Sequence, residues 1–338
     1  MRLKPVNEQV VVLLGASSGI GRESALRLAA RGAKVVVAAR SEPGLLSLVA
    51  EIHAHGGEAT SVVCDVADVE QVRHVAEVAE QVYGRVDTWV NVAATSVYAK
   101  FEDTTPEEFR RVMEVNYLGQ VHGTLAALPA LRRAGGGALI AISSVEALVS
   151  LPLRAAYSAS KHAVEGAMDA LRRELIADHE PISVTSIKPG TINTPFFNNA
   201  LNKMDVKPKG PPPIYQPNVV ADCVLHAAQH PVRDLYAGGG GRQMALSQLT
   251  MPRQVDAVLG RFGIPAERTE EPTPGGSAGN LYAPRTEDNR TEGDFSGRAR
   301  RFSVYTWSRL HAPAALATGS LLGVGLVQLL RAARTTKS

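Results

Sequence analysis

Short apolar runs alternate with helical patterns between residue 10 and residue 236. The apolar runs have strand length and lie at 10–14, 35–39, 59–64, 88–92, 138–143 and 182–188. Helix signals fall between them, and a last helix and strand are predicted near 218–230 and 232–236. Apolar strands separated by helices are typical of a parallel sheet that is buried on both faces. The pattern predicts an α/β fold, a Rossmann-type doubly wound, mainly parallel sheet with helices on both faces.

The clearest helix start is the sequence Thr-Pro-Glu-Glu at 105–108. A threonine followed three residues later by glutamate forms a capping box, and proline suits the first helical position. The helix is expected to run to about Arg133, because three glycines follow at 135–137.

The regular alternation fades after residue 189. Residues 195–217 contain Phe196, Phe197, Met204 and three consecutive prolines, which predicts a long mobile excursion rather than a core element. These apolar side chains indicate a lid over a substrate site, with Tyr98 as a further candidate for its lining.

Three parts of the chain are expected. Residues 1–262 form the nucleotide-binding domain. Residues 263–305 are rich in Pro, Gly, Glu, Arg and Thr, which predicts a largely disordered or extended linker. Residues 306–338 form an apolar C-terminal helix with basic flanks.

The C-terminal helix has two interpretations. Residues 312–330 carry no charge, and as a helix they would measure roughly 28 Å, close to the hydrocarbon thickness of a bilayer. A span would carry Arg331, Arg334 and Lys337 across the membrane, against the positive-inside tendency. The segment is therefore expected either to contact an anionic membrane surface or to dock as a helix on the domain or in a dimer interface.

Composition and charge narrow the class of protein. With 338 residues, 45% hydrophobic and 20% charged, the chain can bury a sizeable core. Residues 295–338 hold seven basic residues and no acidic one, which leaves 29 basic against 33 acidic residues in the first 294. This mildly acidic body argues against a nucleic-acid partner. Cys64 and Cys223 lie far apart in the sequence and indicate neither a disulfide framework nor a zinc site, so we expect a cytoplasmic protein. The histidines are not spaced as metal ligands are, so we expect no metal site.

The sequence Gly-Ala-Ser-Ser-Gly-Ile-Gly at 15–21 joins the first predicted strand to a helix that begins near Ile20. Glycines permit a tight turn and a close backbone approach, and a helix N-terminus offers unpaired N–H groups to a pyrophosphate. Taken alone, the motif could also be a plain strand-to-helix connection. The candidate cofactor-binding residues here are Gly15, Ser17, Ser18, Gly19, Ile20 and Gly21.

A candidate acid–base pair lies further along the chain. Tyr157 and Lys161 are four residues apart on a predicted helix and so share one face. A nearby ammonium stabilises a phenolate, which is expected to lower the pKa of Tyr157 toward the working pH. Ser144 follows the fifth predicted strand, where its hydroxyl could bind a substrate oxygen at the opening of the crevice.

The glycine-rich turn together with Tyr-Ser-Ala-Ser-Lys at 157–161 resembles the short-chain dehydrogenase/reductase family, in its branch of compact single-domain oxidoreductases. The resemblance covers roughly residues 8–240. It implies a catalytic tetrad of Asn116, Ser144, Tyr157 and Lys161. In that family the tyrosine protonates the carbonyl oxygen, the lysine also holds the nicotinamide ribose, and the asparagine holds a water linked to the lysine.

The resemblance also implies cofactor contacts after several strands. Asp65 and Val66 match the pair at the adenine ring, and residues 189–194 resemble the element at the nicotinamide carboxamide and the pyrophosphate. Residues 91–94 stand in place of the family's Asn-Asn-Ala-Gly element and depart from it at two positions. The contacts implied are Asp65, Val66, Asn91, Ala93, Tyr157, Lys161, Pro189, Gly190, Ile192 and Thr194.

Arg40 ends the second strand, where an acidic residue would bind the ribose 2′-hydroxyl of NAD. A guanidinium suits a 2′-phosphate instead, so NADP(H) is favoured and NAD(H) stays the alternative. The sequence predicts an NADP-dependent oxidoreductase acting on the carbonyl or secondary alcohol of a hydrophobic small molecule, and the resemblance implies a homo-oligomer. A non-catalytic NADP-binding sensor or scaffold, recruited through the C-terminal tail, is the alternative function, although it would have no use for the Tyr–Lys pair.

Overall fold

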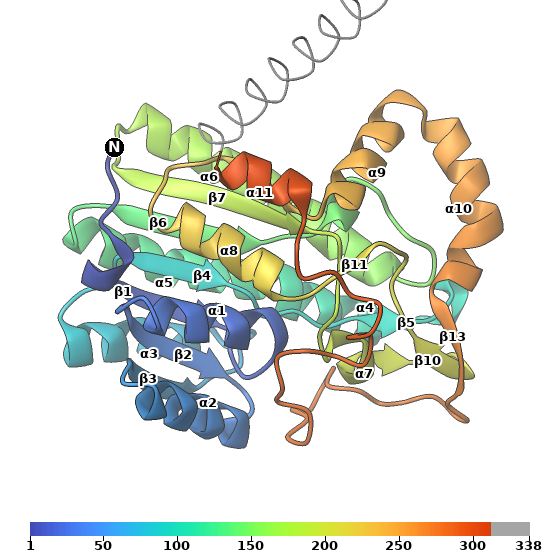
Figure 1. Ribbon diagram of the computed structural model, residues 1–338, viewed down its shortest axis with the longest axis horizontal. Coiled ribbons are helices and arrows are strands. Elements are labelled where there is room, and N and C mark those ends of the chain that lie inside the picture. The colour runs from blue at the N-terminus through green and yellow to red at the C-terminus, as the bar shows by residue number, and fades with distance from the viewer. Residues whose placement is uncertain (312–338) are drawn as a thin grey trace, which may run out of the picture.

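The computed structural model describes residues 1–311 and is built on one parallel sheet of seven strands (Figure 1). The strand order is β3-β2-β1-β4-β6-β7-β12, and every neighbouring pair runs parallel. The strands are β1 (Val10–Leu14), β2 (Lys34–Ala39), β3 (Glu58–Val63), β4 (Thr88–Asn91), β6 (Gly137–Ile142), β7 (Ile182–Pro189) and β12 (Asp234–Ala237). The predicted doubly wound parallel sheet is confirmed.

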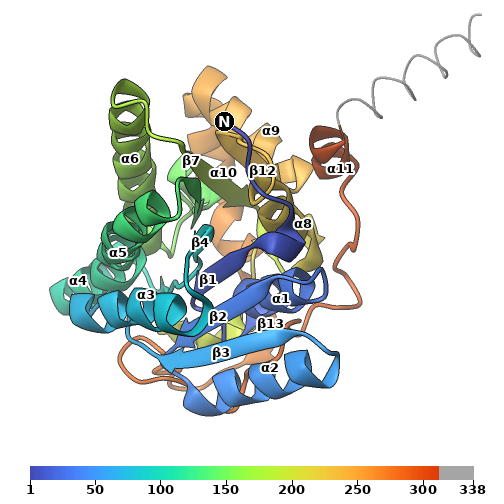
Figure 2. The same cartoon turned by 90° about the vertical axis from the view of Figure 1, so that its left-hand side faces the viewer.

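Helices cover both faces of this sheet, as the view along its edge shows (Figure 2). In β1, Val11 and Leu13 belong to the cluster under α1, α2 and α8, whereas Val12 and Leu14 belong to the cluster under α3, α5 and α6. Successive side chains of a strand point to opposite faces, so an apolar run fills both layers. The helices are α1 (Gly19–Ala29), α2 (Glu42–Ala54), α3 (Val69–Tyr83), α4 (Pro106–Met113), α5 (Gly119–Arg133), α6 (Ala155–Ala177) and α8 (Asn218–Ala227).

The capping box at 105–108 is present. The Thr105 hydroxyl accepts from the Glu108 N–H, and the Glu108 carboxylate accepts from the Thr105 N–H. The helix that it opens reaches Arg133 as predicted, but a π-helical turn at Glu114–Leu118 divides it into α4 and α5. Such turns are rare and often occur at functional sites, and this one carries Asn116.

Residues 195–217 pack against the domain, which differs from the mobile excursion expected from the sequence. Phe197 and Met204 are buried with Tyr98 in a small cluster, against which Phe196 and Phe295 pack. The excursion contains α7 (Phe196–Asn199), β9 (Leu201–Asn202), β10 (Val206–Pro208) and β11 (Ile214–Tyr215), with β9 pairing to β5 (Val97–Tyr98) and β11 to β8 (Thr191–Ile192). Its aromatic side chains are ordered because partners from elsewhere in the chain cover them.

Residues 263–305, expected to be a largely disordered or extended linker, follow a defined path with little helix or strand. After α9 (Gly239–Thr250) and α10 (Pro252–Ala266), β13 (Arg268–Pro272) pairs antiparallel with β10. The chain then returns along the excursion beside α7 to α11 (Val304–Leu310) (Figure 1). Its polar side chains form hydrogen bonds with distant parts of the domain, a source of order that composition does not reveal.

The start of the predicted C-terminal helix docks on the domain. In α11 the Thr306 hydroxyl accepts from the Gly238 N–H and donates to the Tyr236 carbonyl, and Leu310 packs against the sheet core. The rest of that prediction, including the membrane contact through 312–330, lies outside the described residues. Among residues 1–311, no helix is both long enough and apolar enough to cross a membrane.

Candidate active site

Two adjoining cavities lie at the carboxyl edge of the sheet. The larger, of about 190 Å³, is lined by the glycine-rich turn, by Ser144 and Tyr157, and by residues that follow β7. The smaller, of about 120 Å³, lies at the ends of β2 and β3. Gly15 and Ser18 line both cavities. This edge is where open parallel α/β sheets bind ligands.

Most of the residues predicted from the sequence line these cavities. The larger cavity is lined by Gly15, Ser18, Gly19, Ile20, Gly21, Ser144, Tyr157, Pro189, Gly190, Ile192 and Thr194. The smaller cavity is lined by Gly15, Ser17, Ser18, Arg40, Asp65, Val66 and Ala93. Three predicted residues, Asn91, Asn116 and Lys161, line neither and are almost fully buried.

The glycines of the turn are required by close backbone approaches. A Cβ on Gly15, whose φ is +93°, would lie 2.5 Å from the Ala93 nitrogen. A Cβ on Gly21 would lie 2.1 Å from the Gly15 carbonyl oxygen. The turn can therefore fold tightly onto the sheet only without side chains at these positions, which places the first residues of α1 beside the larger cavity.

Arg40 and Asp65 face the smaller cavity from neighbouring strands. The Arg40 guanidinium donates to the backbone carbonyls of Asn280 and Tyr282. Burial raises the pKa of Asp65, but the Ala67 N–H and the Arg111 guanidinium outweigh it and hold that pKa below its usual value. Asp65 thus stays ionised and ties the start of the β3–α3 connection to Arg111.

The side chain of Asn91 is turned away from the cavities. Its Oδ1 accepts from Trp89 Nε1 at 2.9 Å, and its Nδ2 donates to the Gln120 carbonyl at 3.4 Å. A Cβ on Gly123 would lie 2.1 Å from that Oδ1. The amide therefore joins β4 to α5, and the neighbouring Ala93 is the residue of this element that reaches the smaller cavity.

The four residues of the predicted tetrad come together around the start of α6. Tyr157 and Ser144 both line the larger cavity. Lys161 lies behind Tyr157, with Nζ 5.6 Å from the centre of the phenol ring and donating to the Ile142 carbonyl at 2.8 Å. Asn116 sits deeper, accepting from the Thr95 N–H at 2.8 Å and donating to the Ser160 hydroxyl at 3.0 Å.

Burial dominates the titration of the Tyr–Lys pair. It raises the pKa of Tyr157 well above the usual value, helped by the nearby Glu146 carboxylate and opposed by Ser144 and Arg154. It also lowers the pKa of Lys161 to about 8, although Glu146 and Glu165 raise it. The expectation that the pKa of Tyr157 would be lowered is therefore not met, because burial and the Glu146 carboxylate outweigh the opposing influence of Ser144 and Arg154.

A buried charge network beside Tyr157 was not anticipated from the sequence. Arg154 Nη1 lies 2.9 Å from Glu146 Oε1, and Nη2 lies 2.8 Å from Glu267 Oε1. The guanidinium also lies 5.3 Å from the centre of the Tyr98 ring and 6.0 Å from that of Tyr157. Glu146 and Arg154 could have been noticed, because both fall between Ser144 and Tyr157 in the sequence. Nothing in the sequence marks their distant partner, Glu267.

The element after β7 contacts the glycine-rich turn. A Cβ on Gly19 would lie 3.0 Å from the Cβ of Thr194, so the two segments touch. The Asn193 amide donates to Gln216 and Ser296 and accepts from the Phe295 N–H, which links the element to the C-terminal segment.

Residues of the C-terminal segment also line both cavities. Asn280 lines each of them, and Pro284, Arg285, Asp288 and Asn289 line the smaller one. Sequence reasoning missed these residues because their segment had the composition of a linker. Tyr98, a predicted lining residue, is instead fully buried in the cluster behind the larger cavity.

Comparison with known proteins gives a consistent result. A family model described as short chain dehydrogenase matches residues 9–205. An uncharacterised oxidoreductase, YxnA of Bacillus subtilis, is 38% identical over 275 residues, which are 81% of this chain and 77% of that protein. Dehydrogenase/reductase SDR family member 7B of Bos taurus is 40% identical over 202 residues, 58% of this chain and 62% of that protein.

Solved structures show the same similarity. A short chain dehydrogenase from Mycobacterium paratuberculosis, bound to NAD, has a TM-score of 0.63 and 27% identity, covering 70% of this chain and 98% of that one. A variant of actinorhodin polyketide ketoreductase with NADPH has a TM-score of 0.54 and 33% identity, covering 57% of this chain and 74% of that one.

Proposed function

Because the chain belongs to the short chain dehydrogenase family, we propose that it transfers hydride between a nicotinamide dinucleotide and the carbonyl or secondary alcohol carbon of an apolar molecule. The observation that carries this proposal is the single cavity shared by Tyr157, Ser144 and the glycine-rich turn. An acid–base group and a phosphate-binding turn around one cavity are the two halves of such a site.

The residues present fit a dinucleotide. Gly15 and Gly21 let the turn fold tightly onto the sheet, because a Cβ at either position would collide with backbone, and α1 begins beside the larger cavity. Backbone N–H groups at a helix N-terminus, with the positive end of its dipole, bind phosphates. The turn would hold the pyrophosphate, with Lys161 near the nicotinamide ribose and Asp65 and Val66 at the adenine. Nicotinamide, when bound, supplies or accepts the hydride.

The protein's own groups would handle the proton and the developing charge. Ser144 and Tyr157 line one cavity, so both hydroxyls can reach the same substrate oxygen. The raised pKa of Tyr157 keeps the phenol protonated at neutral pH, ready to donate to the oxygen of a carbonyl under reduction. The Lys161 ammonium then stabilises the phenolate that this transfer leaves.

The lining of the larger cavity favours an apolar substrate. Val149, Leu151, Phe196 and Phe197 contribute to it. A further groove of about 410 Å³ between α9 and α10 shares Leu151, Pro211 and Met244 with this cavity and continues it along mostly apolar side chains. A substrate with an extended apolar tail could place its carbonyl at Tyr157 and its tail in the groove.

For the cofactor we propose NADP(H). The end of β2 offers Arg40 and no carboxylate, and Arg285 lines the same cavity. A charge-assisted hydrogen bond from a guanidinium to a 2′-phosphate is worth about 1.5–3 kcal/mol. Arg40→Ala should therefore lower kcat/KM with NADPH by about 10–100-fold relative to NADH, and an unchanged ratio would contradict the preference.

The proposed reaction is tested by NADPH oxidation over a panel of lipophilic ketones, comparing Tyr157→Phe with Tyr98→Phe. Both changes remove one phenolic oxygen from a buried tyrosine. The Tyr98 hydroxyl has no hydrogen-bond partner among residues 1–311, and the residue does not line the cavity. We expect Tyr157→Phe to abolish turnover and Tyr98→Phe to retain it; turnover that survives Tyr157→Phe would refute the assigned acid–base role.

The groove is tested with substrates that differ in tail length. Val258 lines the groove and is 55% exposed, whereas Leu249 is 81% exposed and does not line it. Val258→Ser should raise KM for long-tailed ketones by about tenfold, the free energy of one buried apolar side chain, and leave short ketones unaffected. Leu249→Ser should change neither; equal effects of the two variants would show that the groove does not bind substrate.

A further inference from the structure

We propose that residues 279–296, called the strap below, gate the dinucleotide cleft: the strap must lift for a nicotinamide dinucleotide to enter or leave, so it sets the rate of cofactor exchange. The inference rests on the proposed function for the identity of the ligand. Its basis is a set of contacts that fasten the strap to the glycine-rich turn, to the end of β2 and to the excursion.

The strap first touches the turn itself. The Gly19 N–H donates to the Arg290 carbonyl at 3.0 Å. Gly19 is the first residue of α1, where backbone N–H groups have no partner within the helix and are free to bind phosphate. Nearby, the Ser41 hydroxyl donates to Asn289 Oδ1 at 3.1 Å. The strap therefore lies directly against the elements expected to hold the dinucleotide.

The strap then crosses between the two cavities. Asn280 lines both, and its side chain accepts from the Thr95 hydroxyl at 2.8 Å. Its carbonyl accepts from Arg40, and its N–H donates to the Asn199 carbonyl at 2.7 Å. A dinucleotide that fills both cavities must pass this point. Its adenine and nicotinamide ends are bulkier than the pyrophosphate between them, so it cannot be threaded past a fixed Asn280.

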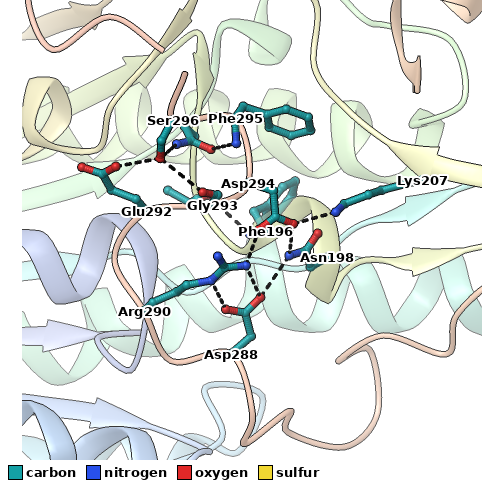
Figure 3. Close-up of polar contacts among 12 residues, drawn as sticks. Phe196, Asn198, Lys207, Asp288, Arg290, Glu292, Gly293, Asp294, Phe295 and Ser296 are labelled. Carbon is teal, nitrogen blue, oxygen red and sulfur yellow. Dashed lines mark hydrogen bonds and ion pairs between the residues drawn. The ribbon is translucent and has the colours of Figure 1, made fainter. Parts of the chain in front are cut away.

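Figure 3 shows the polar contacts that fasten the strap to the excursion. Asp294 accepts from Lys207 Nζ at 2.6 Å and from Asn198 Nδ2 at 2.9 Å, and it also pairs with Arg290. Burial raises the pKa of Asp294, but these donors together hold it well below its usual value. Within the strap, Arg290 pairs with Asp288 at 2.6 Å as well as with Asp294, and Asp288 also accepts from Asn198 Nδ2 of the excursion at 3.1 Å.

These fastenings are suited to opening. The side chains of Lys207, Asp294 and Arg290 are 18%, 29% and 50% exposed, so water can replace the contacts they make. Ion pairs in that environment contribute little each and are weakened by salt. Apolar burial is sparse, since Leu281 is the one fully buried apolar side chain of the strap. Segments with few apolar contacts open locally at low cost in free energy.

The closing experiment uses two Gly→Ala variants four residues apart. A Cβ on Gly293 would lie 2.6 Å from the Thr194 carbonyl oxygen and 2.8 Å from Asn193 Oδ1, so the strap has to lift. A Cβ on Gly297 meets no atom of residues 1–311 within 4 Å. Association and dissociation of NADPH are followed by stopped-flow fluorescence. Both rates should rise by about tenfold in Gly293→Ala, the effect of losing one or two such fastenings, and stay at the wild-type values in Gly297→Ala.

A second pair of variants covers the case in which Gly293→Ala does not fold. Asp294→Asn weakens the contacts in Figure 3, and Asp169→Asn is its control, because Asp169 is 28% exposed and pairs with arginines on α6 and before β12. Asp294→Asn should speed NADPH exchange and the hydrogen exchange of peptides from the strap; Asp169→Asn should do neither.

The outcomes are separable. If wild-type protein binds NADPH and every folded variant exchanges it at the wild-type rate, the strap is a static part of the domain and the gate is refuted. If wild-type protein binds neither NADPH nor NADH, the proposed function fails, and the gate fails with it.

Discussion

The substitution Arg154→Met probes the buried network beside Tyr157. The Arg154 side chain is 6% exposed, and its partners Glu146 and Glu267 are 7% and 1% exposed. Methionine keeps much of the volume but leaves two buried carboxylates without a counter-charge. Removing one partner of a buried ion pair costs about 3–5 kcal/mol. Because this guanidinium serves two carboxylates, we expect a loss near the upper end, about 5 kcal/mol in the free energy of unfolding near pH 8.

The loss should shrink at lower pH. Burial raises the pKa of Glu267 to about 7 even with Arg154 in place, and it raises the pKa of Glu146 as well. Without Arg154, both carboxyls hold protons in the folded state at pH values where the unfolded chain, with a glutamate pKa of about 4.3, has released them. The stability of the variant therefore falls as pH rises above about 4.3, by up to about 2.7 kcal/mol per pH unit for two groups.

Urea unfolding followed by circular dichroism at about pH 5.5 and about pH 8 measures this difference. The control combines Arg154→Met with Glu146→Gln and Glu267→Gln, which removes the charges and should recover much of the stability. The reasoning fails if the loss is equal at the two pH values, or if the triple variant is as unstable as the single one. In either case the cost would come from packing against Tyr98 rather than from charge.

Three further predictions follow from the geometry of the site. Gly21→Ala places a Cβ 2.1 Å from the Gly15 carbonyl oxygen; fluorescence titration should show NADPH binding lost or weakened by more than about tenfold, since the turn must rearrange. Asn116→Ala removes hydrogen bonds to Thr95 and leaves buried groups unpaired, so the free energy of unfolding should fall by about 2–3 kcal/mol in urea. Wild-type stability should fall as pH rises from about 4.3 towards 7, because the folded-state pKa of Glu267 is raised to about 7, and Glu267→Gln should flatten that profile.

The parts of the fold that could be predicted depend on local pattern. Most strands of the main sheet are apolar runs, and their alternation with helices indicates a parallel sheet covered on both faces, so the type of sheet was predictable. The glycine-rich turn and the proximity of Tyr157 and Lys161 were predictable for the same reason, because each depends on particular residue types within a few positions of one another. The glycines of the turn that carry its tightest approaches, Gly15 and Gly21, are among the predicted residues.

The missed features depend on contacts between distant positions. Glu267 reaches Arg154 across 113 positions, and Asn280 reaches Thr95 across 185. Neither residue stands out locally, because isolated polar residues in a stretch rich in proline and glycine are typical of a linker. Asn91 shows the converse case: its motif indicated the cofactor site, but its carboxamide is used by Trp89 and Gln120.

The direction in which the pKa of Tyr157 is shifted could not be predicted from the sequence either. The four-residue spacing of Tyr157 and Lys161 correctly predicts that they lie near each other, with Nζ 5.6 Å from the ring centre. It does not give the depth of burial, which decides the balance between desolvation and the attraction of the ammonium. In this structure burial prevails at both residues.

The position of the strap in the chain has a consequence for synthesis. The last strand of the main sheet ends at Ala237, whereas the carbonyl that meets Gly19 belongs to Arg290. Chains are made from the N-terminus at about 5–20 residues per second, and domains generally fold as units while this proceeds. The sheet and the glycine-rich turn can therefore form several seconds before the residues that close over them exist. A newly made molecule would meet its first dinucleotide with an open cleft, and slow exchange would begin only after residues 279–296 have been made and have closed over the turn.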